Sequence, residues 1–317
     1  MQNVIINKAA FFSILLGLVG FAIGCDSSES SLHEEEIVVE SYLVVDEPLP
    51  PVWLSKSIPV NATFSTAGTA LKDASVRIHL LTAQGGIERT YDYEESSEEL
   101  GAYHSVQNDA VLGGRTYRLE VDGGPNFERV TAETTTPEGF ELIAPSAEEI
   151  AYQDPSQYSM LVTQSAVKGG QNVFVFTMES LDPTIENLVP IYFRFIFDKD
   201  IEEIDTVEWT MEDLQEVLVY SSPPISEGNY EVFDNGTLRV KLPWFAVAFF
   251  GPLKVTMTVL DRNLFDFQRY QQVQQGGSTL SPGEIPNVRD HIENGRGLFG
   301  SSARVSHTVT ILRESSN

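Results

Sequence analysis

The sequence predicts a mainly all-β fold: an Ig-like β-sandwich followed by a second β-rich domain with one or two short helices. Short runs rich in Val, Ile, Tyr, Phe and Thr recur along the chain, and Gly, Asn, Asp or Pro separates them. Seven such runs lie between residues 37 and 135, a density typical of Ig-like sandwiches. The run 115–121 alternates cleanly, which places Tyr117, Leu119 and Val121 on one face of a half-buried strand.

The composition indicates a folded, acidic protein and excludes some classes of function. The chain has 317 residues, of which 42% are hydrophobic, and carries 20 Lys or Arg against 46 Asp or Glu, for a net charge of -26. This apolar content rules out wholesale disorder. The acidity argues against nucleic-acid binding, which needs clustered Lys and Arg. The single cysteine excludes a disulfide framework within the chain and a zinc site built from cysteines.

Residues 1–24 have the pattern of a lipoprotein signal peptide. Lys8 precedes an apolar stretch over residues 9–20, and Phe21-Ala22-Ile23-Gly24-Cys25 then resembles a bacterial lipobox. We expect cleavage before Cys25 and lipidation of its side chain, which anchors the protein in the outer membrane, on the periplasmic face or at the cell surface. Two alternatives stay open. The residues before Cys25 also fit an ordinary secretory cleavage site, and an uncleaved anchor would be shorter than the ~20 residues of a spanning helix.

Residues 25–35 predict an acidic, flexible tether. They consist mainly of Ser, Asp and Glu and contain too few apolar residues to fold on their own. Such a run works either as a surface-sorting signal of the kind found in Bacteroidetes-like lipoproteins or as a solvated spacer. The sequence leaves both interpretations open.

The first folded domain is predicted over residues 36–136. Its expected strands, in chain order, are 37–45, 52–60, 74–82, 87–93, 102–107, 115–121 and 127–135. Glycine-rich turns at 85–86, 113–114 and 122–125 separate several of them. Pro137 and Gly139 follow the last strand, so we expect a domain boundary there. A single domain whose strands cross between sheets is the alternative.

The second domain is predicted over residues 137–317, with a helix near 262–275 and a shorter one at 211–218. The expected strands are 173–179, 191–197, 238–242, 244–250, 253–260 and 303–312. The run 191–197 is aromatic on both faces, which favours a central strand. Asp234-Asn235-Gly236 predicts a type I′ hairpin turn. In the helix near 262–275, apolar residues recur every three positions until Gly276-Gly277 ends it.

Several segments resemble a known family. The opening strand with 37–57, the segment 113–121 and the closing run Asn294-Gly295-Arg296-Gly297-Leu298-Phe299-Gly300 occur in this order in Bacteroidetes-type outer-membrane lipoproteins of domain-of-unknown-function family 4249. The resemblance covers most of residues 36–313, and Arg296 departs from the neutral residue of the family pattern. It implies a surface or periplasmic accessory protein, often encoded near TonB-dependent outer-membrane receptors. It carries no catalytic residue over to this chain, and no cofactor is expected.

Two segments are candidates for binding sites. Gly295, Arg296 and Gly297 would form a loop whose backbone N–H groups hold an anion or a partner's carboxylate; a turn that only needs glycine conformations is the alternative. Asp198, Asp200 and Glu202 place oxygen ligands at alternating positions and are a weak candidate for calcium, because the full calcium-loop pattern is missing.

Three classes of function follow. The first is a non-enzymatic outer-membrane or surface lipoprotein that serves as an accessory or interaction subunit in TonB-dependent nutrient uptake. The alternative is a surface adhesin module that binds glycan or matrix, with Trp53, Trp209 and Trp244 as stacking platforms. The third is a hydrolase that uses carboxylates without a recognisable motif. The five histidines form no metalloprotease spacing, and no nucleophile-elbow motif occurs.

Overall fold

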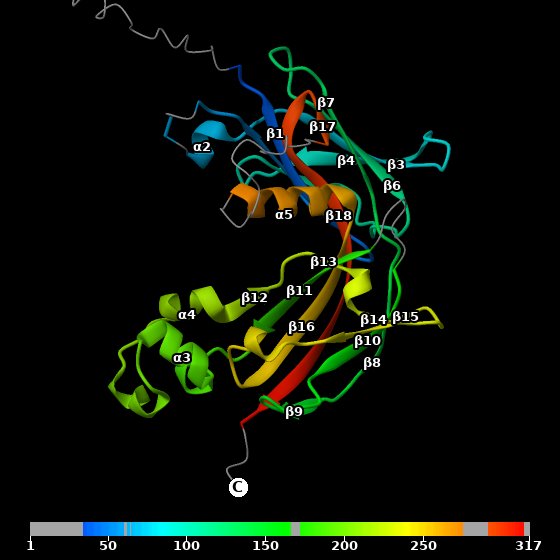
Figure 1. Cartoon of the computed structure of the whole chain (residues 1–317). Helices are drawn as coiled ribbons and strands as arrows, with labels where there is room; N and C mark the ends of the chain where they lie inside the picture. The colour runs from blue at the N-terminus through cyan, green and yellow to red at the C-terminus, as the bar shows by residue number, and fades with distance from the viewer. Residues whose placement is uncertain (1–33, 60–61, 64, 166–171, 275–290, 314–317) are drawn as a thin grey trace, which may run out of the picture. The chain divides into compact units, whose positions relative to one another are not determined.

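The computed structural model describes residues 34–59, 62–63, 65–165, 172–274 and 291–313. Residues Glu35–Asn317 form one compact unit, and this unit is mainly β (Figure 1). The predicted mainly β fold class with short helices is therefore confirmed. Within the described part of the chain, no helix combines the length and the apolar character needed to cross a membrane.

All seven strands predicted between residues 37 and 135 are present. They are β1 (Ile37–Val44), β2 (Val52–Lys56), β3 (Ser75–Leu81), β4 (Ile87–Glu95), β5 (Ala102–Ser105), β6 (Thr116–Asp122) and β7 (Val130–Thr135), with the short helix α2 (Thr66–Thr69) between β2 and β3. In β6, Tyr117, Leu119 and Val121 are buried and Arg118 and Glu120 are half-buried. The alternation in the sequence thus identified the face that packs inward.

The end of the chain closes these strands into a ring. Their order by hydrogen bonding is β1-β2-β5-β4-β3-β6-β7. Strand β17 (Ile292–Glu293) pairs antiparallel with β7, and the first half of β18 (Gly295–Leu312) pairs parallel with β1. Only Asn294 separates β17 from β18. We call β1–β7, β17 and residues 295–302 the strand ring. Its buried cluster includes Leu43, Ile78, Tyr103, Tyr117, Leu119, Ile292 and Phe299.

The second half of β18 belongs to a different set of strands. It pairs antiparallel with β16 (Gly251–Leu260) and parallel with β9 (Glu149–Ala151). Beyond β16 lies β11 (Val173–Ser180), which pairs with β12 (Val219–Ser221) and β13 (Ile225–Ser226). Figure 1 shows β18, in red, running from the strand ring into this lower group of strands.

A smaller sheet faces this group. Its order is β14 (Glu231–Phe233), β15 (Thr237–Lys241), β10 (Ser159–Thr163) and β8 (Leu142–Pro145). We call the two facing sheets the sandwich. Their shared buried cluster includes Tyr158, Met160 and Val240 from the smaller sheet side and Phe176, Met178, Val255 and Met257 from the larger sheet. The ring and the sandwich therefore have separate buried clusters, with β18 common to both, and the predicted boundary at residue 137 follows β7.

A helical insertion interrupts the sandwich between β11 and β12. It contains η2 (Ile185–Asn187), α3 (Pro190–Phe197), η3 (Ile201–Thr206) and α4 (Met211–Leu218). The prediction of a central strand at 191–197 is wrong, because this segment is α3. Pro190 suits the first helical turn, and Asp198 ends the helix in a left-handed conformation with a φ of 53°. Phe193 and Phe197 pack together on one side, with ring centroids 5.1 Å apart.

Of three further predicted elements, one is confirmed and two differ in the structure. The helix near 262–275 is confirmed as α5 (Arg262–Gln274). The strand predicted at 244–250 is wrong: Pro243 leads into the 3-10 helix η5 (Trp244–Ala246), and an irregular segment follows. The hairpin at 234–236 has a three-residue loop in which Gly236 alone has a positive φ, 76°, so its turn is not type I′.

A buried polar cluster joins the start of α5 to the strand ring. The carboxylate of Asp261 accepts hydrogen bonds from the Leu264 backbone N–H at 2.9 Å and from Thr134 Oγ1 at 2.5 Å. Thr134 also lies 2.7 Å from Ser301 Oγ. The amide of Asn263 donates to the carbonyls of Glu133 and Phe299, both at 2.8 Å. The start of α5 is thereby fixed against β7 and β18.

Candidate functional site

The predicted lipidation residue, Cys25, lies outside the described residues, as do the signal peptide and most of the tether. The end of the tether and the first residue after it can be placed. Glu35 lies 3.7 Å from the ammonium of Lys56 in β2. Glu36 accepts a hydrogen bond of 2.9 Å from Arg296 Nε in β18. The chain therefore enters the strand ring through two ion pairs.

The segment of Gly295, Arg296 and Gly297, expected as a loop, is the start of strand β18. Its residues pair with Ile37, Val38 and Val39 of β1. Gly297 has a φ of 108°, and a Cβ built on it would lie 2.0 Å from the Val39 carbonyl oxygen. Glycine is required here by close approach of two backbones. Anion binding by this segment stays a prediction. In the structure, the backbone of the segment is paired with β1.

The calcium candidates do not converge on one point. Asp198 ends α3, Asp200 forms an ion pair with Arg194, and Glu202 lies in the first turn of η3. Across the described residues, no three side chains of His, Cys, Asp or Glu are placed to share a metal ion.

The described histidines each have a nearby acidic or hydroxyl partner. His79 is buried and lies 2.9 Å from Thr90 Oγ1, His104 lies 3.0 Å from Glu99, and His307 lies 2.8 Å from the Tyr158 hydroxyl. The tryptophans lie apart from one another. Trp53 in β2 is 39% exposed, whereas Trp244 is half-buried and donates its ring N–H to the Asp154 carbonyl at 3.1 Å. Trp209 packs partly buried against the cluster of the helical insertion, so the three rings lie on different elements.

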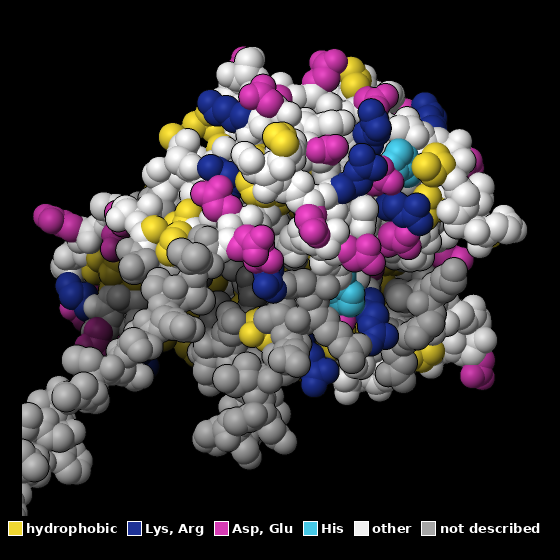
Figure 2. Space-filling view, turned by 90° about the horizontal axis from the view of Figure 1, so that it is seen from above, with side chains coloured by type: hydrophobic (Ala, Val, Ile, Leu, Met, Phe, Trp, Pro, Cys, Tyr) yellow, Lys and Arg dark blue, Asp and Glu magenta, His cyan; other side chains and the backbone are white. Residues whose placement is uncertain are grey.

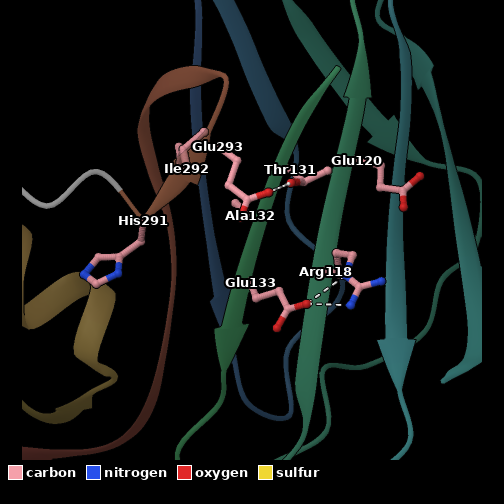
Figure 3. A pocket seen from close by; sticks show the side chains of 8 residues that line it. All are labelled: Arg118, Glu120, Thr131, Ala132, Glu133, His291, Ile292 and Glu293. Atoms are coloured by element: carbon pink, nitrogen blue, oxygen red, sulfur yellow. Dashed lines mark hydrogen bonds and ion pairs between the residues drawn. The ribbon is translucent and has the colours of Figure 1, made fainter. Parts of the chain in front are cut away.

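A charged groove of about 630 Å³ lies over β6, β7 and β17. Figure 3 shows its side chains, with dashed lines that join Arg118 to Glu133 and Thr131 to Glu293. Arg118 donates to Glu133 at 2.8 Å, and Thr131 donates to Glu293 at 2.9 Å. His291 turns toward α5, where its Nε2 lies 3.0 Å from Asp266. Basic and acidic side chains are also intermixed over the upper face seen in Figure 2. Arg118 and Glu133 thus form an ion pair inside the groove, whereas Glu293 is held by a hydroxyl and Glu120 lies 3.5 Å from His79 Nε2.

The helical insertion carries the most exposed apolar side chains. Among the described residues, the large hydrophobic side chains with the highest exposure are Phe195 at 77%, Ile191 at 64% and Phe245 at 63%. Ile191 and Phe195 are four residues apart and share one face of α3. The Tyr192 hydroxyl donates to the Phe245 carbonyl, which places η5 next to the start of α3. We call Ile191 and Phe195 the apolar face.

Acidic residues surround the apolar face in the sequence. Residues 190–218 contain nine Asp or Glu and only two basic residues, Arg194 and Lys199. Arg194 is paired with Asp200. A hollow of about 500 Å³ adjoins the face and is lined by Tyr152, Gln153, Pro190, Ile191, Arg194 and Phe250. The insertion therefore presents exposed apolar groups within a strongly acidic segment.

An apolar pocket of about 270 Å³ lies between the two sheets of the sandwich. One wall comes from β10 and β15, including Met160 and Val240, and the other from β11 and β16, including Phe176, Met178 and Val255. At its rim, Tyr220 and the exposed Phe245 meet edge to face with ring centroids 5.8 Å apart. The pocket's lining is almost wholly apolar, unlike that of the charged groove.

One polar group in the pocket lining lacks a partner. The Tyr230 hydroxyl is buried and makes no hydrogen bond within the described structure. Its ring packs edge-on against Phe174 and Phe176, at 5.7 and 5.9 Å between centroids. Burial raises the pKa of this phenol, so it is a neutral hydrogen-bond donor at pH 7. Leaving such a group unsatisfied costs about 1–3 kcal/mol.

Sequence reasoning missed this pocket. Its residues come from six separate strands and from the segments around Pro223 and Pro243, and no local spacing connects them. Tyr220 and Tyr230 do flank the proline-rich stretch 222–225, which marks an irregular strand edge. That signal was present, but it identifies a turn and not a cavity.

The comparison with protein families identifies the family to which the chain belongs. The model for a domain of unknown function, DUF4249, matches residues 23–308. The chain belongs to this family. The DUF4249 match covers both the strand ring and the sandwich, together with residue 25. No curated protein matches the sequence.

Solved structures similar to this DUF4249 chain share little with it in sequence. A Salmonella α2-macroglobulin reacted with methylamine is 12% identical, with 88% of this chain and 15% of that chain covered and a TM-score of 0.24. An Escherichia coli α2-macroglobulin activated by porcine elastase is 11% identical, over 88% and 20% of the two chains, with a TM-score of 0.22. A tetra-tandem repeat from the extending region of a large adhesion protein is 11% identical, with 87% of this chain and 49% of that chain covered and a TM-score of 0.21.

The DUF4249 chain therefore spans a fifth or less of the length of these macroglobulins. All three TM-scores lie below 0.5. No function is inferred from these similarities.

Proposed function

We propose that this DUF4249 protein is a lipid-anchored outer-membrane protein without catalytic activity, which acts as an accessory subunit of a TonB-dependent receptor. The lipobox-like segment that ends at Cys25 supports the anchor. Two or more acyl chains give stable attachment, so the folded part needs no spanning segment of its own. The resemblance to family members encoded near such receptors supports the choice of partner.

The observation that carries the proposal is the apolar face on α3. A solvent-exposed phenylalanine and isoleucine on one side of a short helix are costly to leave in water, and burying them against a partner recovers about 25 cal/mol per Å² of apolar area. Phe193 and Phe197 on the opposite side already anchor the helix to its own cluster, which also holds Leu188, Leu214 and Phe249. The exposed side of α3 is thus free to serve binding.

The charge of the insertion supports a basic partner surface. Nine acidic residues against two basic ones in residues 190–218 repel anionic lipid and favour Lys or Arg on the partner. We therefore place the receptor contact on this insertion, where exposed apolar groups and acidic residues occur together, and not on the ring, where Arg77, Arg89 and Arg118 are paired with acidic side chains.

A pull-down from membranes tests this proposal. The full chain, tagged after Asn317, is extracted in mild detergent, and co-purifying proteins are identified by mass spectrometry. We expect one outer-membrane barrel at comparable stoichiometry, lost when Cys25→Ala removes the anchor. Phe195→Ser is expected to reduce recovery of the barrel at least tenfold, since it removes a central apolar contact.

The matched control is Ile87→Ser, which changes a 54% exposed apolar residue on β4 of the strand ring. It should leave recovery of the barrel unchanged. Recovery of the chain alone from wild-type membranes would contradict the receptor partner. Equal recovery with Phe195→Ser and with wild type would contradict the apolar face as the contact.

A further inference from the structure

The three longest pairings among the described strands lie in series between the tether and the helical insertion. The first joins β1 to β18 in parallel along the whole of β1, from Ile37 to Val44. The second joins β18 to β16 along ten residues, and the third joins β16 to β11 from Phe174 to Ser180. The other pairings of described strands are shorter, including those of β3, β4, β6 and β7 in the strand ring.

The two ends of this series lie at opposite ends of β18. The tether leads into Ile37, which is opposite Gly295, the first residue of β18. The helical insertion follows β11, whose last residue Ser180 is opposite Leu253 of β16, and Leu253 is in turn opposite Val309 near the end of β18. Figure 1 shows the start of β1 and helix α3 well apart along this direction. A pull between the tether and the insertion therefore acts along the strands and not across them.

Paired strands resist a lengthwise pull better than a crosswise one. When force acts along two paired strands, the hydrogen bonds between them must break within the same short displacement. When force acts across the strands at one end, the same bonds break one after another. The survival of a fold under force is governed by its rate of unfolding, so the direction of the load decides how long the fold survives.

Side chains also hold β1 in its position. Ile37, Val39 and Leu43 are at most 1% exposed and belong to the buried cluster of the strand ring. A shift of β1 by one residue would carry all three to the outer face, because successive side chains of a strand point to opposite faces. The two ion pairs just before β1 connect the chain there to both adjacent strands, β2 and β18. Displacement of β1 along its own axis therefore disrupts its hydrogen bonds and its packing together.

We propose that β1, β18, β16 and β11 form a force path, which carries mechanical load between the lipid anchor and a partner bound to the insertion. The proposal rests on the anchor and the receptor contact proposed for this protein. It gives the chain a mechanical function in addition to binding. A subunit that is attached at one end and bound at the other stays folded under tension only if the strands between these points are loaded lengthwise, as they are here.

Single-molecule pulling in two directions tests the force path. Handles are attached through cysteines introduced at exposed positions of the full chain, from which Cys25→Ala has removed the native thiol. One handle is at Glu34→Cys, before β1, in both experiments. The other is at Leu181→Cys, just after β11, for the lengthwise pull, or at Glu293→Cys, beside the start of β18, for the crosswise pull. At equal loading rate, we expect the lengthwise rupture force to be higher by about twofold or more.

Two buried valines of the same cluster show whether β1 bears the load. Val39 in β1 and Val121 in β6 are both 0% exposed. Val39→Ala and Val121→Ala remove the same atoms, so they should lower the midpoint of urea unfolding by similar amounts. Only Val39→Ala should lower the lengthwise rupture force, because β6 lies outside the force path.

Equal rupture forces in the two directions would overturn the proposal. A lengthwise rupture force that Val39→Ala lowers no more than Val121→Ala would also overturn it. If Val39→Ala does not fold, the comparison of directions still decides, because it leaves the core unaltered. The pulling experiment needs no partner, so a recovered barrel together with equal rupture forces would remove the force path and leave the receptor contact in place.

Discussion

In the strand ring, each of β1–β7 has a paired neighbour on both sides, whereas the sandwich ends in edge strands at β8, β12 and β14. Pairing on both sides occupies much of the backbone of these strands, so mainly their side chains can meet other molecules. Several of its basic side chains, including Arg77, Arg89 and Arg118, form ion pairs with acidic neighbours. The open sandwich instead leaves a pocket between its sheets and carries the helical insertion, with its apolar face. From this difference we expect the ring to support the molecule and the sandwich to provide any binding surface.

The largest expected effect breaks the ring where it closes. Gly297→Ala would place a Cβ 2.0 Å from the Val39 carbonyl oxygen, at a φ of 108° that other residues rarely adopt. The β1–β18 pairing must then separate, so we expect a loss of more than about 4 kcal/mol in the free energy of unfolding. Urea denaturation followed by circular dichroism measures it.

Gly85→Ala is the matched control for this substitution. Gly85 has a φ of 84°, yet a Cβ there meets nothing within 4 Å. It should cost only about 1 kcal/mol, the backbone term alone. Equal losses in the two variants would show that the contact with Val39 does not hold the ring closed.

The next effect separates the two sides of α3 in the sandwich. Phe193 is fully buried and Phe195 is 77% exposed. Phe193→Ala should therefore lower the free energy of unfolding by about 3 kcal/mol, and Phe195→Ala should change it by less than about 0.5 kcal/mol. Thermal and chemical denaturation of both variants measures the difference. Similar losses would mean that Phe195 packs within the chain and is unavailable to a partner.

The smallest expected effect concerns Asp261, which follows the sandwich strand β16 and bonds to Thr134 of the strand ring. Burial raises the pKa of the Asp261 carboxyl above its usual 3.8, although hydrogen bonds from Thr134 and Leu264 oppose the shift. The folded state then binds a proton more tightly than the unfolded state, so this group's contribution to stability falls as the pH rises from 3.8 through the raised pKa. Above that pKa the contribution is constant.

Comparison with Asp261→Asn isolates this contribution. The free energy of unfolding of wild type minus that of the variant should decrease as the pH rises through this window. Denaturation curves at stepped pH measure it, and Asp205→Asn, at an exposed position in η3, controls for the loss of one negative charge. A difference that rises with pH would refute the sign.

The sequence predicted β1–β7 strand by strand, but it missed β17 and the first half of β18, which close the ring, and it predicted the sandwich only in part. Alternation in β6 and the glycine turns reflect local rules, which hold where every strand has one polar and one apolar face. At 190–197 the same reasoning failed. The high β propensity of its aromatic residues predicted a strand, but Pro190 and the packing of Phe193 on the insertion's own cluster favour a helix.

The candidate sites, too, could be predicted from the sequence only in part. Arg296 and its flanking glycines were noticed for their spacing, and the structure gives Gly297 a steric reason for being glycine. The pocket was missed, because its walls come from strands that are paired or opposed only in the folded chain. Tyr230 has no local feature that reveals a buried, unpartnered hydroxyl.

The pairing of Ile37 with Gly295 has a consequence for the order of folding. A chain that emerges with its N-terminus first holds β1 without its parallel partner until almost the entire folded unit has been made. Contacts this distant in sequence form slowly, because a long loop must close before they contribute. The first seven strands can therefore close into the ring only after almost the whole folded unit has been made, and removal of the last strand would open the ring and the sandwich together.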